Sequence, residues 1–173
     1  MRRFSSQVIY QIGFAASCLL CTIFSFMTVY KLNCEYTNGT SSVISAHMAD
    51  YGRVYNALVI LALLAGVVSI FIYFNKAVVV ACGILLCGVG IKFMTYADSL
   101  KGQIHLVTGS TDAVVNMLGD VLDALSGQPM VIQDKLAGEF TAWFFAYMIS
   151  AVASLFFGIM CAVFIKADRY SSY

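Results

Sequence analysis

Phe140 to Ile165, FTAWFFAYMISAVASLFFGIMCAVFI, is a run of twenty-six residues without a charge. At about 1.5 Å per residue, a helix of this length crosses the hydrocarbon core of a bilayer. Because helices in lipid associate through close packing, small residues at regular spacing are typical of a helix-packing face. Here they recur at every fourth position: Ala142, Ala146, Ser150, Ser154, Gly158 and Ala162. The stretch therefore predicts a membrane-spanning helix that packs closely on neighbouring helices.

The composition of the whole chain agrees with a membrane protein. Of its 173 residues, 61% are hydrophobic and only 11% are charged, whereas about a quarter of the residues in a soluble domain are charged. We therefore expect a single membrane domain over residues 1–173, surrounded by the lipid bilayer. The chain has no basic cluster with interleaved aromatic residues, so nucleic acid is not an expected partner.

Three further apolar runs, 8–30, 54–74 and 77–96, precede the run at 140–165. The first could be a signal peptide, but its length and the lack of a small-x-small cleavage site favour a retained signal anchor. The predicted fold is all-α: a polytopic four-transmembrane-helix bundle with outer loops at 31–53 and 97–139. Small residues in the other spans predict further packing positions: Gly13, Ser17, Cys21 and Ser25 in the first, and Gly83 and Gly88 in the third. We expect the first and last spans to pack together and close the bundle.

Charge predicts the orientation, because Lys and Arg near the ends of spans favour the cytoplasmic side. With both termini in the cytoplasm, the inner segments carry five basic residues against one acid, and the outer loops carry four against eight. The five are Arg2, Arg3, Lys76, Lys166 and Arg169. We expect cytoplasmic termini and an integral protein of the plasma membrane or another secretory-pathway membrane.

The expected first outer loop contains two candidate modification sites. Asn38-Gly39-Thr40 is an N-glycosylation acceptor, which makes the chain a candidate glycoprotein. Cys34 is the only cysteine outside the predicted spans. An unpaired outer cysteine is either a free thiol or a partner in an intermolecular disulfide.

The second outer loop shows helical periodicity. Val114, Leu118, Val121, Leu122 and Leu125 repeat at helical spacing, between start signals at 110–112 and stop signals at 127–129. They predict a short amphipathic helix with an acidic polar side, which covers this chain's own bundle or packs on a partner. A second short helix is expected from Val131 to Leu136.

Lys92 is the only charge within a predicted span. It lies four residues before Tyr96, near the expected outer boundary, so it either snorkels to the surface or faces a cavity or partner. Cys18 and Cys21 are three residues apart, but no His or carboxylate in a span accompanies them, so we expect no metal site. The chain lacks a nucleophile motif and a phosphate-binding loop. We expect no enzymatic activity and no cofactor.

The spacing of spans and loops resembles the tetraspan membrane proteins, and tetraspanins in particular. The Cys-Cys-Gly signature of tetraspanins is absent, because 97–139 contains no cysteine. The resemblance implies a role in organising other membrane proteins and supplies no site residues. The leading hypothesis is a non-enzymatic structural or accessory subunit that docks on other integral membrane proteins through small-residue helix faces and the second outer loop. The alternatives are a homo-oligomeric channel or pore built from copies of the chain and, more weakly, a membrane enzyme component.

Overall fold

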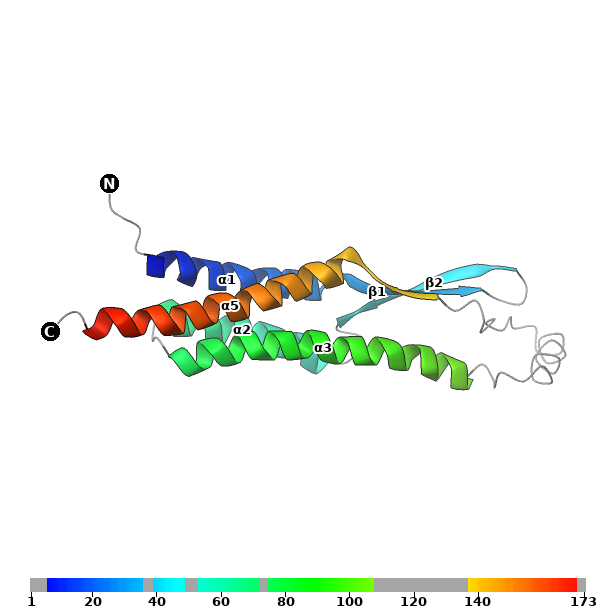
Figure 1. Ribbon diagram of the computed structural model, residues 1–173. Coiled ribbons are helices and arrows are strands. Elements are labelled where there is room, and N and C mark those ends of the chain that lie inside the picture. Colours follow the sequence, from blue (N-terminus) through cyan, green and yellow to red (C-terminus); the bar gives the residue numbers. More distant parts are fainter. Residues whose placement is uncertain (1–5, 36–38, 49–52, 72–74, 108–136, 171–173) are drawn as a thin grey trace.

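The computed structural model describes residues 6–35, 39–48, 53–71, 75–107 and 137–170. Figure 1 shows four long helices lying side by side, with a small sheet beyond one end of the bundle and both chain termini at the other. We call these the sheet end and the terminal end. The elements are α1 (Ser6–Ser25), β1 (Thr28–Glu35), β2 (Ser41–His47), α2 (Arg53–Phe71), α3 (Lys76–Val107), β3 (Ala137–Phe140) and α5 (Ala142–Tyr170).

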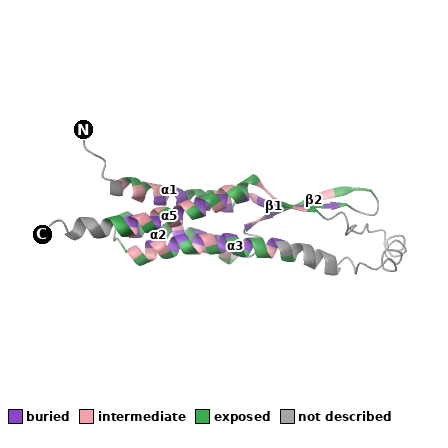
Figure 2. Cartoon of the chain, in the orientation of Figure 1, coloured by how far each residue is buried: buried purple, intermediate pink, exposed green. Residues whose placement is uncertain are grey.

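The four helices form a closed bundle, in which α5 packs on α1 and α3, and α2 packs on the same two helices. Each helix is long and apolar enough to cross a membrane. Large apolar side chains remain exposed on the outward surface, for example Leu64, Ile149 and Val163 (Figure 2). A surface of this kind suits contact with lipid chains. The prediction of four packed helices, each long and apolar enough to span a membrane, is confirmed.

The connection between α2 and α3 ends in a helix cap. Asn75 precedes α3, and its side-chain Oδ1 accepts hydrogen bonds from the backbone N–H groups of Ala77 and Val78, at 3.1 and 3.4 Å. Such bonds satisfy N–H groups that the first turn of a helix leaves without an intrahelical partner. The cap explains why the third helix begins at Lys76.

The expectation of an all-α fold is wrong, because a three-stranded antiparallel sheet stands at the sheet end with the strand order β2-β1-β3. The central strand alternates: Tyr30, Leu32 and Cys34 are buried, whereas the residues between them are exposed. This is the period-two pattern of a strand with one covered face. The turn between β1 and β2 contains Gly39 at φ +78°, a left-handed conformation that glycine adopts without a Cβ penalty.

The sheet also corrects two predicted span boundaries. The first span was expected to reach residue 30, but α1 ends at Ser25 and residues 28–30 begin β1. The last was expected from Phe140, which instead ends β3, and α5 starts at Ala142. The third span, expected over 77–96, agrees with the apolar part of α3, Lys76–Ala97, and the helix itself continues to Val107 and so extends past the bundle. Apolar residues alone do not mark these changes, because the buried face of a strand is apolar as well.

Two predicted helices of the second outer loop, around 112–125 and at Val131 to Leu136, lie outside the described residues. The glycosylation candidate Asn38 lies outside them too.

Candidate functional site

The small residues of α1 face α5. Ser17, Cys21 and Ser25 are buried, and the thiol of Cys21 donates to the backbone carbonyl of Tyr147 at 3.8 Å. A Cβ placed on Gly13 would lie 3.0 Å from the ring of Phe157. The four positions thus line the contact between the first and last helices.

The stripe on α5 is only partly covered. Ser150, Ser154 and Gly158 are buried, Ala146 and Ala162 are half-buried, and Ala142 is exposed. A four-residue step drifts around a helix of 3.6 residues per turn, so the ends of the stripe turn away from the bundle. The positions that remain covered near the sheet end are instead Phe144 and Tyr147.

The hydroxyl groups in these two helices bond to their own helix. Ser17 donates to the carbonyl of Gly13 at 2.7 Å, and Ser150 donates to that of Ala146 at 2.8 Å. The same pattern holds for Thr22, Ser25 and Ser154. Because their polar groups are satisfied locally, these side chains act as small packing units at the helix contacts.

The two predicted glycines of α3 have different surroundings. A Cβ on Gly83 would lie 2.7 Å from the Cα of Leu155, so the backbones of α3 and α5 meet there. Gly88 is exposed, and a Cβ on it would meet nothing within 4 Å. Gly90 in the same helix is buried as well, and a Cβ on it would clash with the Met148 sulfur and lie 3.1 Å from the Tyr147 ring. It lies seven residues after Gly83, about two helical turns along the same face.

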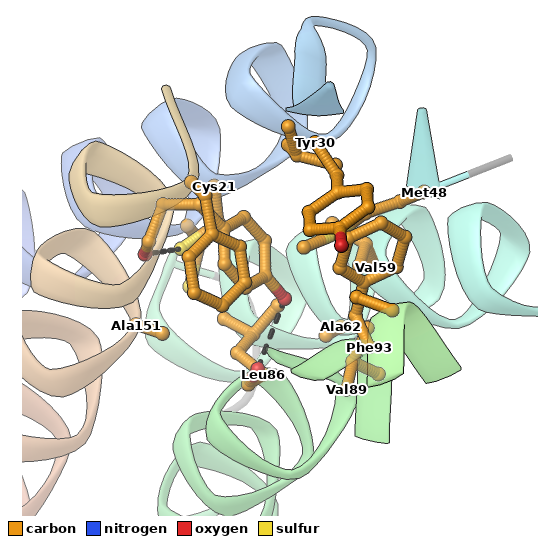
Figure 3. Packing of buried hydrophobic residues seen from close by; sticks show 14 of the residues in the cluster. Cys21, Tyr30, Met48, Val59, Ala62, Leu86, Val89, Phe93 and Ala151 are labelled. Atoms are coloured by element: carbon orange, nitrogen blue, oxygen red, sulfur yellow. Dashed lines mark hydrogen bonds between the residues drawn. The ribbon is translucent and has the colours of Figure 1, made fainter. Parts of the chain in front are cut away.

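An aromatic cluster joins the sheet to the bundle. The ring of Tyr30 in β1 lies 5.1 Å from Phe140 in β3, and Phe140 lies 4.5 Å from Phe144 in α5. Phe144 in turn lies 6.1 Å from Phe93 in α3. Figure 3 shows Tyr30 close to Phe93, with Val59 of α2 beside them. Ring pairs at these separations are favourable, so they fix the sheet on the end of the bundle.

Thr141 makes a polar connection at the same junction. Its hydroxyl donates to the carbonyl of Thr28 at 2.6 Å, and its backbone N–H donates to the carbonyl of Val29 at 3.0 Å. Thr141 lies between β3 and α5, whereas Thr28 and Val29 begin β1. These bonds tie the start of the sheet to the start of the last helix.

Lys92 is exposed and lies at the sheet end of the bundle. Its neighbour Phe93 contacts Phe144, in the first turn of α5, so Lys92 is level with the start of that helix. A lysine at such a level reaches the polar boundary of a bilayer with its ammonium group. Snorkelling and contact with a cavity or partner both stay predictions for Lys92.

The cysteines of the spans are in or beside the core. Cys18, Cys21, Cys82 and Cys161 are buried, Cys87 is half-buried, and all are free thiols. No group of three metal-ligating side chains occurs among the described residues. Cys34 is also a free thiol, and its side chain is 1% exposed on the covered face of β1. Burial raises the pKa of the Cys34 thiol, and an intermolecular disulfide requires this thiol to become exposed.

A groove between α1 and α2, which sequence analysis did not find, opens on the outward surface of the bundle. Its volume is about 470 Å³. The adjacent small residues Ala15 and Ala16 are the signal in the sequence, because they leave room beside the larger side chains. Nine apolar residues line it: Ile12, Ala15, Ala16, Leu19, Leu63, Leu64, Val67, Val68 and Phe71.

No protein-family model matches this chain, and no curated protein matches its sequence. The fold therefore defines the class: a protein with four candidate membrane-spanning helices and a three-stranded sheet at one end of the bundle.

Proposed function

We propose that the chain is a non-enzymatic structural or accessory subunit that binds another integral membrane protein within the bilayer. The groove between α1 and α2 carries this proposal. Exposed side chains such as Ile12, Leu19 and Leu64 border it, and Ala16 leaves its centre open. Because helices in lipid associate where small residues permit close approach, such a groove suits a helix of a partner protein.

In the proposed orientation both termini are cytoplasmic, and the sheet lies on the lumenal or extracellular side. Arg2 and Arg3, which precede α1 in the sequence, and Lys76, the first residue of α3, support this orientation. The glycosylation motif at Asn38 then lies on the side where glycans are added. The matching test is a glycosidase-sensitive shift in electrophoretic mobility that Asn38→Gln abolishes. Absence of the shift from protein made in a glycosylating cell would leave the orientation supported by charge alone.

The small-residue stripes expected to bind a partner are instead mostly covered within the bundle. Ser17, Cys21, Ser150 and Ser154 are all buried. We therefore place the docking face on the groove rather than on these stripes. The alternative of a pore has less support, because the hydroxyls of Thr22, Ser25 and Ser150 donate to their own helices.

A matched pair of variants tests the groove. Ala16→Phe fills it, whereas Ala81→Phe makes the same change at an exposed position of α3 outside it. The tagged full-length chain is isolated from its native membrane in mild detergent, and the proteins that accompany it are quantified by mass spectrometry. We expect Ala16→Phe to lower recovery of an integral membrane partner roughly tenfold, corresponding to about 1.4 kcal/mol. Equal recovery with both variants, or no partner with the wild type, would overturn the proposal.

A further inference from the structure

The hydrogen bonds of the sheet identify which groups of β2 face its open edge. Val29 and Thr141 stand opposite each other in the continued register of β1 and β3, and the N–H of Thr141 donates to the carbonyl of Val29. In an antiparallel ladder such hydrogen-bonded pairs alternate with non-bonded pairs. Lys31 and Asn33 therefore direct their backbone groups toward β3, while Tyr30, Leu32 and Cys34 direct theirs toward β2.

The register between β1 and β2 completes the assignment. Leu32 stands opposite Ile44, and Cys34 stands opposite Ser42, so Ser42 and Ile44 use their backbone groups within the sheet. The intervening Ser41, Val43 and Ser45 direct their N–H and C=O groups away from β1. Because β2 is the end strand of the described sheet, these groups form its open edge.

This edge lacks the usual protection against pairing. Edge strands are commonly blunted by charged residues, proline or a very short length. The seven residues SSVISAH of β2 include neither proline nor a Lys, Arg, Asp or Glu. Val43 is 58% exposed and Ile44 is 47% exposed. The opposite edge strand, β3, has four residues and carries Glu139.

From this geometry we propose that the β2 edge binds the β2 edge of a second copy of this chain, embedded in a facing membrane. The two strands run antiparallel, with Val43 opposite Val43 of the second copy and Ser41 opposite its Ser45. Each of the three resulting pairs exchanges two backbone hydrogen bonds. The contact is homophilic and joins two membranes.

Symmetry selects the antiparallel arrangement. A two-fold axis through Val43 makes the edge complementary to itself, as a closed interface between identical chains requires. It also brings the exposed apolar residues together, since Val43 meets its own copy and Ile44 lies diagonally across from its copy. In a parallel pair, a residue whose backbone groups point at the neighbouring strand stands opposite a residue whose groups point away from it. Parallel pairing of two β2 edges would therefore need one strand to be shifted by one residue along the other. A two-fold axis along the membrane normal does not provide that shift.

The direction of the strands places the second copy in a facing membrane. Figure 1 shows the β1–β2 hairpin extending beyond the end of the bundle in roughly the direction of the helices, so β2 lies roughly along the membrane normal. When two β2 strands pair antiparallel, the two bundles therefore point in opposite directions, each toward its own membrane. Val43 is level with Asn33, five residues beyond Thr28, or about 17 Å at the rise of an antiparallel strand. Two copies would span roughly 34 Å between their Thr28 residues by the same rise.

Engineered cysteines test the register and the facing arrangement together. The full-length chain is reconstituted in two vesicle populations with different tags, sheet end outward, and oxidised with copper–phenanthroline. Val43→Cys should form dimers containing both tags, because directly opposite Cα atoms about 5.5 Å apart permit a disulfide. Ile44→Cys should not, because its nearest copy is diagonal, at about 7–8 Å.

The antiparallel register makes a second, stricter demand. Ser41→Cys in one population should cross-link to Ser45→Cys in the other, whereas neither variant should cross-link to itself. Cross-linking of Ser41→Cys to itself would indicate a different register or strand direction and overturn the proposal. Disulfides that carry only one tag would place the contact within a single membrane, and would overturn it as well.

Proline variants test whether the edge itself holds the vesicles together. Val43→Pro removes an outward N–H and leaves the ladder with β1 intact, as proline is tolerated at such edge positions. Wild-type vesicles should cluster, as measured by light scattering. Val43→Pro should reduce clustering roughly tenfold, or about 1.4 kcal/mol per contact, with an unchanged unfolding midpoint. Ile44→Pro, which removes an inward N–H, should lower that midpoint too. Undiminished clustering by folded Val43→Pro, or no clustering by wild type, would refute the contact.

Discussion

Tyr147 of α5 donates its hydroxyl hydrogen to the backbone carbonyl of Leu86 in α3, at 2.9 Å, within the buried core (Figure 3). Gly90 lies one helical turn after Leu86, and a Cβ there would come within 3.1 Å of the Tyr147 ring. The same Cβ would clash with the sulfur of Met148, so glycine at this position leaves room for both side chains of α5. The carbonyl has a second lone pair available besides the one used by its own helix.

Tyr147→Phe should weaken the contact between α3 and α5 while preserving the ring packing. Polar contacts between helices in membranes contribute about 0.6 kcal/mol on average and up to about 1.7 kcal/mol, so we expect a loss in that range. The measurement is the unfolding free energy in mixed detergent micelles. Tyr10→Phe is the control, because its ring stacks on Phe164 and its hydroxyl has no hydrogen bond among the described residues. An equal loss in both variants would assign the effect to general hydroxyl removal.

Gly83 and Gly88 provide a comparison within one helix. Gly83→Ala places a Cβ 2.7 Å from the Cα of Leu155, so the α3 and α5 backbones must separate. We expect a cost of about 1–3 kcal/mol, by analogy with overpacked cores. Gly88→Ala has open space around it and should be neutral or stabilising by up to about 1 kcal/mol through helix propensity. The yield and unfolding midpoint of the detergent-solubilised chain measure both. Similar results for the two would contradict the close approach at Gly83.

The four spans were predictable because length and hydropathy suffice to identify a helix that crosses lipid. The β1 signal was also present, as Tyr30 to Glu35 alternates between apolar and polar residues, but it follows an apolar run without a break. β3 could not be read from its own residues. It forms because β1, more than a hundred residues earlier, offers an edge to Ala137–Phe140, and local sequence does not encode such a pairing.

The candidate sites also include residues that the sequence predicted and residues that it did not. The small residues of α1 lie at a helix contact because packing in lipid favours them there. The strict four-residue pattern of α5 includes the exposed Ala142, whereas the covered positions include Phe144 and Tyr147. Large side chains at a helix contact carry no compositional signal that separates them from lipid-facing ones. The groove between α1 and α2 depends on two helices together, so Ala15 and Ala16 mark only one of its two walls in the sequence.

Cys34 should react slowly with alkylating reagents in the folded protein. Its side chain is 1% exposed, and burial raises the pKa of the thiol above its ordinary value of 9.0, which lowers the fraction of reactive thiolate. Alkylation at neutral pH, followed by peptide mass spectrometry, should be slower than at Ser45→Cys on the exposed face of the same sheet. The difference should disappear in denaturant. Equal rates in the folded state would show that the Cys34 thiol is readily exposed.

The same pKa shift predicts a dependence of stability on pH. Since the folded state favours the protonated thiol, its contribution to stability is complete below the unfolded pKa. It is lost as the pH rises from about 9.0 toward the higher folded pKa. Cys34→Ser should reduce this alkaline loss, as measured by unfolding midpoints at increasing pH, and an unchanged profile would contradict a buried thiol.

Gly158→Leu tests the packing face from which the fold was predicted. Gly158 is buried, and a Cβ there would lie 3.3 Å from the Phe14 ring and from the carbonyl oxygen of Val79. A leucine side chain therefore overfills a contact shared by α1, α3 and α5. Lipid chains offer no compensating gain in burial, because they are as apolar as leucine. We expect a cost of about 1–3 kcal/mol, by analogy with overpacked soluble cores.

Phe156→Leu is the matched control, since Phe156 is 53% exposed on the outward side of the same helix. It should remain close to wild type. The amount of folded chain that survives in mild detergent compares the two variants directly. Equal survival would mean that the small residues of α5 reflect the ordinary composition of a membrane helix rather than close packing. A larger loss with Gly158→Leu would show that the contact of α5 with α1 and α3 depends on the missing side chain.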